Sequence, residues 1–504
     1  MDSLGNASLP ASDRSFKIFS RINGSVFEYY SRKKALYIFK KASQRVPAYR
    51  KFLGQHNIDP KSIRSIEDFN NLVPCTTKDN YIRYYSLNER CINGKIPLKI
   101  TLDESSGTSG EPTFWVRSED EEKYLKMLMK ASFKHLYGFN NDDNFFVLNC
   151  FMQVGWTGGQ RFASRISHLA SVKNVGPDAA KVIRVLKELG QGFTYLIGGY
   201  PPFILDLIEY GRNLDHFNWQ DYSIHIFAGG EGFVEEWRSH VSSRLKSGAK
   251  IFSDYGAIDL DAGISVETPF SVILRRLMIE DAGLRKALLS TDRLPCFIGQ
   301  FSNQQFYIRE IENNQEGKEL EITVMNLKSV SPSIKYIIGD EGGIMRFQDV
   351  CKILDNSGYP LTKLKQDYNI PVIIPFPFIW LYGRHDGTVT INGAMISQNE
   401  ISEALLSETV LVESINAFKM WVTSDKDNYI KLFISLEARN NVQINESLIR
   451  CSNEVILNKL VESNECFRVS YRKDPVRHRP LIDIIPFSTG LFKQKEDTVK
   501  YRYI

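Results

Sequence analysis

The sequence lacks paired cysteines and a large excess of either charge. Its seven cysteines are scattered without Cys-x-x-Cys spacing, so we expect free thiols in a reducing compartment rather than disulfides or a zinc site. It has 63 lysines and arginines against 59 acidic residues, a net charge of +4. This excess is too small for a polybasic surface, so we expect neither a nucleic-acid partner nor a membrane partner.

Long apolar runs are also missing. The most apolar stretch, 371–382, is too short to span a bilayer and is interrupted by three prolines, so we interpret it as buried extended chain. Residues 1–14 contain no apolar segment typical of a secretory signal, which indicates a cytoplasmic protein. With 43% hydrophobic residues over 504 positions, the chain predicts a globular protein of several domains.

Helix-like and strand-like segments alternate along the chain, which predicts an α/β fold. We interpret 1–382 as a large domain of helix-flanked sheets with a β-rich subdomain near 300–350, 383–386 as a hinge, and 387–504 as a small mobile α+β domain. The apolar spacing predicts helices at 26–53, 119–137, 178–190, 400–406 and 446–460, and strands at 144–150, 193–197, 224–228, 250–252, 306–312, 320–325, 343–347, 389–391 and 429–436. Turn residues are expected at 313–314 and 339–340.

Residues 105–113 read Ser-Ser-Gly-Thr-Ser-Gly-Glu-Pro-Thr. The two glycines permit a tight turn whose backbone N–H groups can surround one anion, and the hydroxyl residues add further donors. No Gly-Lys-Ser/Thr follows, so the stretch differs from the P-loop of common NTPases. Alone it indicates either a phosphate-binding loop or a plain surface loop.

Several segments, taken in order, resemble the adenylate-forming ligase superfamily, in particular its phenylacetate–CoA ligase and capsular-polysaccharide branch. The resemblance covers nearly the whole chain. It rests on the 105–113 loop and on the segments 45–50, 72–78, 155–159 (Gly-Trp-Thr-Gly-Gly), 228–231 (Ala-Gly-Gly-Glu), 254–259 (Asp-Tyr-Gly-Ala-Ile-Asp), 336–340 (Tyr-Ile-Ile-Gly-Asp) and 382–386 (Tyr-Gly-Arg-His-Asp).

The resemblance implies ATP and Mg²⁺ as cofactors and a role for each segment. Thr108 is the loop hydroxyl expected to act on the phosphates, Tyr255 stacks on adenine, Asp340 binds the ribose, and Arg384 approaches the ribose or phosphates. Asp259 stands where relatives have a metal-binding glutamate, and Asp261 or Glu231 could share that task. The nucleotide-binding set is Ser105, Ser106, Gly107, Thr108, Ser109, Gly110, Gly230, Glu231, Asp254, Tyr255, Gly256, Asp340 and Arg384, and the acid-binding set is Trp156, Phe227, Gly229 and Ile258.

Relatives also carry a catalytic lysine near the C-terminus, one residue after a glycine. Here Gly490 is followed by Lys493 and Lys495 at larger spacing, and both stay open as candidates. Asp386 is the expected pivot of the small domain.

The resemblance implies that a small carboxylic acid, aryl or medium acyl, is activated as acyl-AMP. Coenzyme A is the expected acceptor; an amine is the alternative, and a free carrier protein is the third choice. The expected oligomeric state is a monomer or a homodimer, and the sequence does not favour either. A non-catalytic nucleotide-binding relative also stays open, and so do structural roles for single residues: Asp340 as a turn residue, Asp259 as a helix N-cap, Tyr255 and Trp156 as core.

Overall fold

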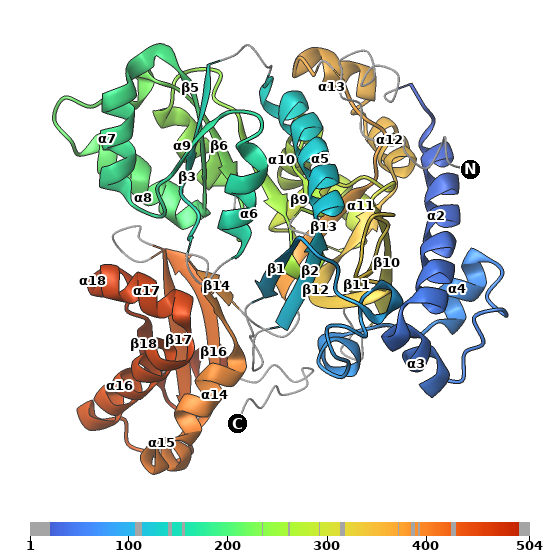
Figure 1. The fold of residues 1–504 in the computed structure, drawn as a ribbon. Helices are drawn as coiled ribbons and strands as arrows, with labels where there is room; N and C mark the ends of the chain where they lie inside the picture. Colours follow the sequence, from blue (N-terminus) through green and yellow to red (C-terminus); the bar gives the residue numbers. More distant parts are fainter. Residues whose placement is uncertain are drawn as a thin grey trace.

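The computed structural model describes residues 21–105, 113–139, 144–153, 157–233, 235–260, 263–291, 293–312, 318–370, 372–384, 389–391, 394–424 and 430–492. In these residues, a large mixed sheet flanked by helices is accompanied by a smaller domain with sheets of its own (Figure 1). The predicted α/β class is therefore confirmed. Within the described part of the chain, no helix is both long enough and apolar enough to cross a membrane.

The large sheet has the strand order β10-β11-β12-β13-β9-β8-β7-β6-β5-β3-β4. The strands from β7 to β4 are parallel, and the remaining pairs are antiparallel. Their bounds are β3 Phe145–Asn149, β4 Ser171–Asn174, β5 Thr194–Gly199, β6 Ser223–Ala228, β7 Ile251–Tyr255, β8 Ser265–Val266, β9 Phe297–Gln300, β10 Phe306–Glu312, β11 Lys318–Val324, β12 Tyr336–Met345 and β13 Phe378–Arg384.

Helices surround this sheet in the order of the chain. They are α2 Gly24–Arg45, α3 Pro47–Gln55, α4 Ile66–Leu72, α5 Glu119–Tyr137, α6 Thr157–Ile166, α7 Ala179–Leu189, α8 Pro201–Arg212, α9 Glu235–Arg244, α10 Pro269–Glu280, α11 Ala282–Leu289, α12 Phe347–Asn356 and α13 Leu361–Asp367. In Figure 1, α7, α8 and α9 lie around the parallel strands, and α2 lies at the opposite side of the domain. Because parallel strands need crossover helices, this arrangement follows from the alternating pattern of the sequence.

Two local predictions are wrong. The helix expected over 26–53 is interrupted, because Val46 is extended (φ −104°, ψ 110°) and Pro47 begins α3. Proline has no backbone N–H and forces the preceding residue out of the helical region. The turn expected at 339–340 lies inside β12, where Gly339 has a positive φ of 92°. Glycine adopts this conformation without steric cost, so the strand continues through it.

The hairpin of β1 (Ile100–Ser105) and β2 (Thr113–Ser118) pairs Ser105 with Thr113 and so frames residues 106–112. The C-terminal domain follows β13. It contains β14 Val389–Ile391, β15 Ala394–Ile396, α14 Gln398–Leu406, α15 Thr409–Ser414, β16 Ile415–Ser424, β17 Ile430–Ala438, α16 Glu446–Ser463, α17 Glu465–Lys473, α18 Pro475–His478 and β18 Leu481–Ile485. The boundary at 383–386 stays a prediction; residues 383 and 384 still belong to β13.

Candidate active site

A cavity of about 450 Å³ opens where the parallel strands end. The carboxyl ends of β3, β5, β6 and β7 lie at the same edge of the sheet, because these strands are parallel neighbours. Segments that follow such strand ends converge, and ligands of open α/β sheets bind in this crevice. Thr390 of β14 and Val422 of β16 also line the cavity, so both domains contribute to its wall.

Tyr255 and Asp340 form a hydrogen-bonded pair in this wall. The Tyr255 hydroxyl donates to Asp340 Oδ2 at 2.5 Å, the short distance typical of a bond to a charged acceptor. Tyr255 ends β7 and Asp340 lies in the middle of β12, so the pair joins the two halves of the sheet. Asp340 lies in a strand rather than in the turn considered from the sequence. Tyr255 lines the cavity and also packs against the hydrophobic core, so both interpretations of this residue stay predictions.

Asp259 lies in a second polar cluster of the same cavity. Its Oδ2 accepts from the Tyr336 hydroxyl at 2.8 Å and lies 3.3 Å from Lys78 Nζ. Asp259 is within the short 3₁₀ turn Ile258–Leu260 and not before a helix, so the N-cap interpretation is wrong. A carboxylate at the cavity wall is a suitable ligand for Mg²⁺, which keeps several waters and binds one or two carboxylates together with substrate phosphates. Among the described residues, no group of three or more His, Cys, Asp or Glu side chains could hold a metal ion by itself.

The turn after β6 is formed by Gly229, Gly230 and Glu231, which all line the cavity. A Cβ at Gly229 would overlap Asp254 Oδ1 and approach Phe151 at 3.5 Å. A larger residue at this position would have to displace the Asp254 carboxylate, so glycine lets the backbone of the turn form part of the wall. A flat ring can therefore approach the peptide planes of this turn.

Asp254 is half-buried beside this turn, and burial raises its pKa to about 7. In the unfolded chain this carboxyl group has a pKa near 3.9. As the pH rises from about 4 to about 7, the unfolded state therefore loses its proton before the folded state does, and the folded state becomes less stable. We expect the advantage of Asp254→Asn over the wild type in unfolding free energy to grow by up to about 3 kcal/mol from pH 5 to pH 8. Chemical denaturation at several pH values measures the unfolding free energy of both proteins. If the unfolding free energies of wild type and Asp254→Asn changed with pH in the same way, the raised pKa of Asp254 would be contradicted. The control is Asp349→Asn, at an exposed position of α12.

Buried ion pairs fix the hairpin that carries the 105–113 loop. Asp103 of β1 accepts from Arg117 Nε at 3.3 Å and from Arg161 Nε at 2.5 Å, and Arg161 also contacts Glu122 at 3.3 Å. Arg117 Nη2 donates to the carbonyl of Ile258 at 2.7 Å. The hairpin is thereby connected to the turn that holds Asp259. Breaking a buried pair leaves an uncompensated charge, so these contacts hold the roots of the loop in place.

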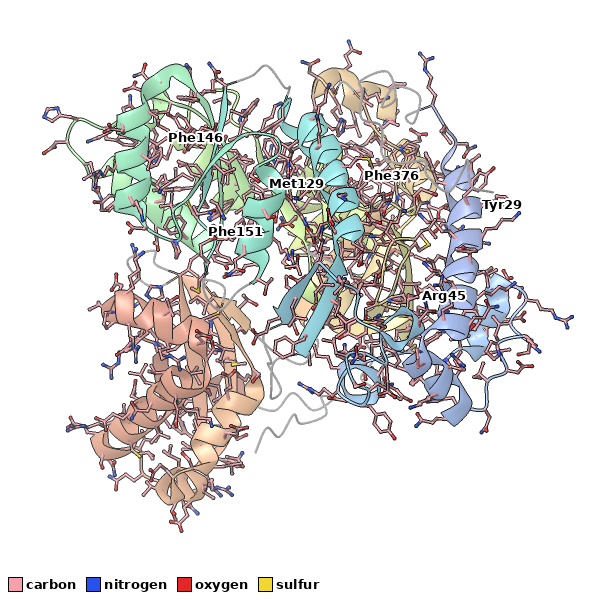
Figure 2. The ribbon with its side chains drawn as sticks, viewed as in Figure 1. Tyr29, Arg45, Met129, Phe146, Phe151 and Phe376 are labelled. Carbon is pink, nitrogen blue, oxygen red and sulfur yellow. The ribbon has the colours of Figure 1, made fainter. Side chains whose placement is uncertain are left out.

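Aromatic side chains form the apolar wall of the cavity. Phe162 stacks on Phe227 with ring centroids 5.2 Å apart, and Phe151 packs edge-on against Phe162 at 5.5 Å. Figure 2 marks Phe151 beyond β3 and Met129 on α5, and both side chains line the cavity. The wall therefore suits an apolar or aromatic group, as the sequence predicted from Phe227 and its neighbours.

The structure brings together nearly all of the predicted site residues that it describes, although their individual roles stay predictions. The cavity is lined by Ser105, Phe227, Gly229, Gly230, Glu231, Asp254, Tyr255, Gly256, Ile258, Asp259 and Asp340. The backbone of Arg384, at the end of β13, lies opposite Asp340. Ser106, Gly107, Thr108, Ser109, Gly110, Trp156, Asp261, Asp386, Lys493 and Lys495 lie outside the described residues.

Sequence reasoning missed Lys78, Tyr336, Tyr200 and Arg161 as members of the site or as supports of its members. Lys78 and Tyr336 belong to quoted motif segments, but nothing in the sequence indicated that both contact Asp259, 181 and 77 residues away in the chain. Tyr200 directly follows β5, and its position at a strand end was the signal that could have identified it.

No protein-family model matches the sequence, and no curated protein matches it. Solved structures do match. A 2-hydroxyisobutyryl-CoA ligase in complex with 2-HIB-AMP and CoA, in the thioesterification state, has a TM-score of 0.61 at 15% identity over 95% of this chain and 90% of that chain. The same ligase in the postadenylation state with 2-HIB-AMP has a TM-score of 0.52 at 15% identity over 94% and 88%.

An open conformation of that ligase, with 2-HIB-AMP and CoA, has a TM-score of 0.50 at 14% identity over 94% of this chain and 90% of that chain. Identity this low bears on the fold alone, and the likeness spans both domains. The chain therefore has the fold of the adenylate-forming ligases.

Proposed function

We propose that this protein activates a carboxylic acid with ATP as an acyl-AMP and transfers the acyl group to coenzyme A. The observation that carries the proposal is the cavity itself, in which the Tyr255–Asp340 pair, the Asp259–Lys78 pair, the root of the 105–113 loop and an aromatic wall meet. The fold of a CoA ligase that binds an acyl-AMP supports it.

The nucleotide is assigned to the polar side of the cavity. Adenine lies between Tyr255 and the peptide planes of 229–231, and Asp340 accepts hydrogen bonds from the ribose hydroxyls. The triphosphate extends toward Ser105 and the loop that begins there, with Thr108 as the principal hydroxyl donor. Asp259 would hold Mg²⁺ together with the phosphates, and the ion would supply positive charge where negative charge develops on the phosphoryl oxygens.

The acid is assigned to the aromatic side, with its carboxylate toward the α-phosphate. A carboxylate oxygen attacks the α-phosphorus, the bond to the β-phosphate oxygen breaks, and pyrophosphate leaves with that electron pair. Lys493 or Lys495, together with Arg384, stabilises the charge of this transition state. An aryl or medium acyl acid fits the wall of Phe151, Phe162 and Phe227.

Coenzyme A is assigned to the side of the cavity lined by Thr390 and Val422. Its thiolate attacks the acyl carbon, and AMP leaves with the former carboxylate oxygen. Swinging of the C-terminal domain about Asp386 separates the two half-reactions.

Pyrophosphate release with Mg-ATP over a panel of aryl and aliphatic acids tests this function, with coenzyme A or mixed amines as acceptors. Without an acceptor, we expect the correct acid to give a single burst of pyrophosphate. When coenzyme A is added, we expect steady turnover with acyl-CoA as the product. If an amide formed with the mixed amines and no acyl-CoA formed with coenzyme A, the acceptor would be an amine. Nucleotide binding without acid-dependent pyrophosphate release over the whole panel would favour the non-catalytic alternative.

A further inference from the structure

Two cationic side chains hold the C-terminal domain against the strand-end edge of the large domain. Arg477 Nη1 lies 3.1 Å from Asp206 Oδ2, and Lys473 Nζ donates to the carbonyl of Pro177. Asp206 lies on α8 and Pro177 in the connection from β4 to α7. Both contacts therefore join α17 and α18 to segments that follow parallel strands.

The Arg477 contact is preorganised on the small-domain side. Asp474 caps α18 by accepting from the Arg477 backbone N–H at 3.0 Å, and Lys431 of β17 donates to the Val476 carbonyl at 3.1 Å. These bonds fix the short helix that carries the guanidinium. On the large-domain side, the Asp206 side chain is only 16% exposed with the small domain in place, so the ion pair is partly shielded from water.

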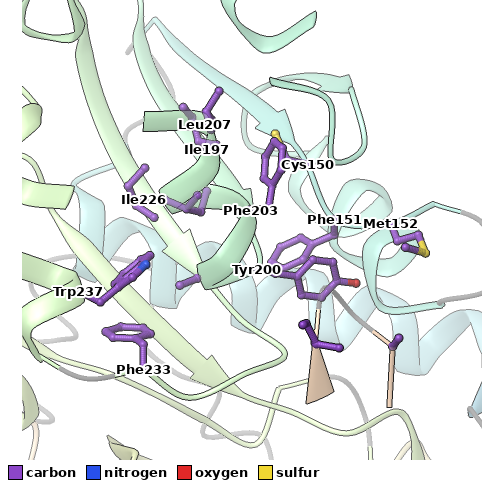
Figure 3. Packing of buried hydrophobic residues seen from close by; sticks show 14 of the residues in the cluster. Cys150, Phe151, Met152, Ile197, Tyr200, Phe203, Leu207, Ile226, Phe233 and Trp237 are labelled. Atoms are coloured by element: carbon purple, nitrogen blue, oxygen red, sulfur yellow. The ribbon is translucent and has the colours of Figure 1, made fainter. Parts of the chain in front are cut away.

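The contact is connected to the cavity through α8. Asp206 is in the helix that begins directly after Tyr200, and Tyr200 lines the cavity. Figure 3 shows Tyr200 beside Phe151 at this face of the core. Thr390 and Val422 of the same small domain line the cavity in this arrangement of the domains.

We propose that Lys473 and Arg477 are positioning residues that hold the small domain in the arrangement used for acyl transfer to the thiol. The inference rests on the proposed function. The higher TM-score of 2-hydroxyisobutyryl-CoA ligase in its thioesterification state than in its postadenylation state supports it. Because the pair Arg477–Asp206 joins the two domains, its free energy shifts the population toward the arrangement in which it forms. Adenylation, which uses the other pose, does not depend on it.

Arg477→Gln, Asp206→Asn and the double variant test the proposal through the two half-reactions. We expect acid-dependent ATP–pyrophosphate exchange to stay within about twofold of the wild type, whereas single-turnover transfer to coenzyme A falls about fivefold in each variant. The double variant should lose no more than either single variant, since both remove one interaction. Arg450→Gln, which breaks an exposed pair with Glu454 within α16 (3.0 Å), is the matched control and should change neither reaction.

Unchanged transfer in both single variants, a parallel loss of exchange and transfer, or independent losses in the double variant would overturn the proposal. A second measurement needs no catalysis: fluorophores at Glu188 on α7 and Glu454 on α16 report the separation of the domains. We expect Arg477→Gln to reduce the fraction of molecules that show the fluorescence energy transfer efficiency of the wild type. An unchanged distribution of transfer efficiencies would overturn the proposal. A wild type without acid-dependent exchange would contradict the proposed function, and the fluorescence result would still decide whether the pair sets the pose.

Discussion

Replacing Asp340 with asparagine is expected to lower kcat/KM for ATP in acid activation by about 100-fold or more. The carboxylate accepts the 2.5 Å bond from Tyr255 and is assigned to both ribose hydroxyls. Each hydrogen bond to a charged group contributes about 1.5–3 kcal/mol, and leaving ribose hydroxyls without a charged acceptor removes two of them. Initial rates of pyrophosphate release against ATP concentration measure the loss.

Two variants accompany this experiment. Tyr255→Phe keeps the ring for stacking and removes only the hydroxyl, so we expect a loss of about fivefold. Asp349→Asn changes an exposed carboxylate outside the cavity and should leave the kinetics unchanged. An Asp340→Asn enzyme with kcat/KM within threefold of the wild type would show that this carboxylate does not bind the nucleotide.

The second large effect is expected at Asp259. Asp259→Asn removes the carboxylate assigned to Mg²⁺ and leaves Lys78, now without its counter-charge at 3.3 Å, beside the metal. We expect adenylation to fall about 100-fold at millimolar Mg²⁺ and the half-saturating Mg²⁺ concentration to rise about tenfold, because a hard cation strongly prefers a charged oxygen ligand. Pyrophosphate release measured over a Mg²⁺ series gives both values.

Tyr336→Phe is the matched control for Asp259, since it removes the 2.8 Å hydrogen bond and leaves the carboxylate. It should lower the rate about fivefold without shifting the Mg²⁺ dependence. If Asp259→Asn and the wild type respond identically to Mg²⁺, Asp259 has a structural role and the metal is bound elsewhere.

The sequence predicted the parallel strands well because they are short, apolar and separated by amphipathic helices. The runs at 193–197 and 224–228 correspond to the parallel strands β5 Thr194–Gly199 and β6 Ser223–Ala228. The break at Pro47 was also accessible, because proline after an extended residue is a local signal. The continuation of β12 through Gly339 was not accessible, because it depends on pairing with β11 and β13 rather than on local preference.

The site was predicted residue by residue but not as a set of contacts. A resemblance can align Asp259 with a metal position, but the contacts of Asp259 with Lys78 and Tyr336 arise from tertiary packing of distant segments. The same holds for Arg477 and Asp206, which belong to different domains. Side-chain pairing over such separations has no periodic signature in one sequence.

The measurement that tests the central claim most directly is the transfer of an oxygen isotope from the acid to AMP. An acid that supports turnover is labelled with ¹⁸O in both carboxylate oxygens and converted with Mg-ATP and coenzyme A. If the acid is activated as an acyl-AMP, the AMP released carries one ¹⁸O atom, because the attacking carboxylate oxygen stays on phosphorus when the thiolate displaces AMP. Unlabelled AMP, or ADP together with labelled phosphate, would contradict the account.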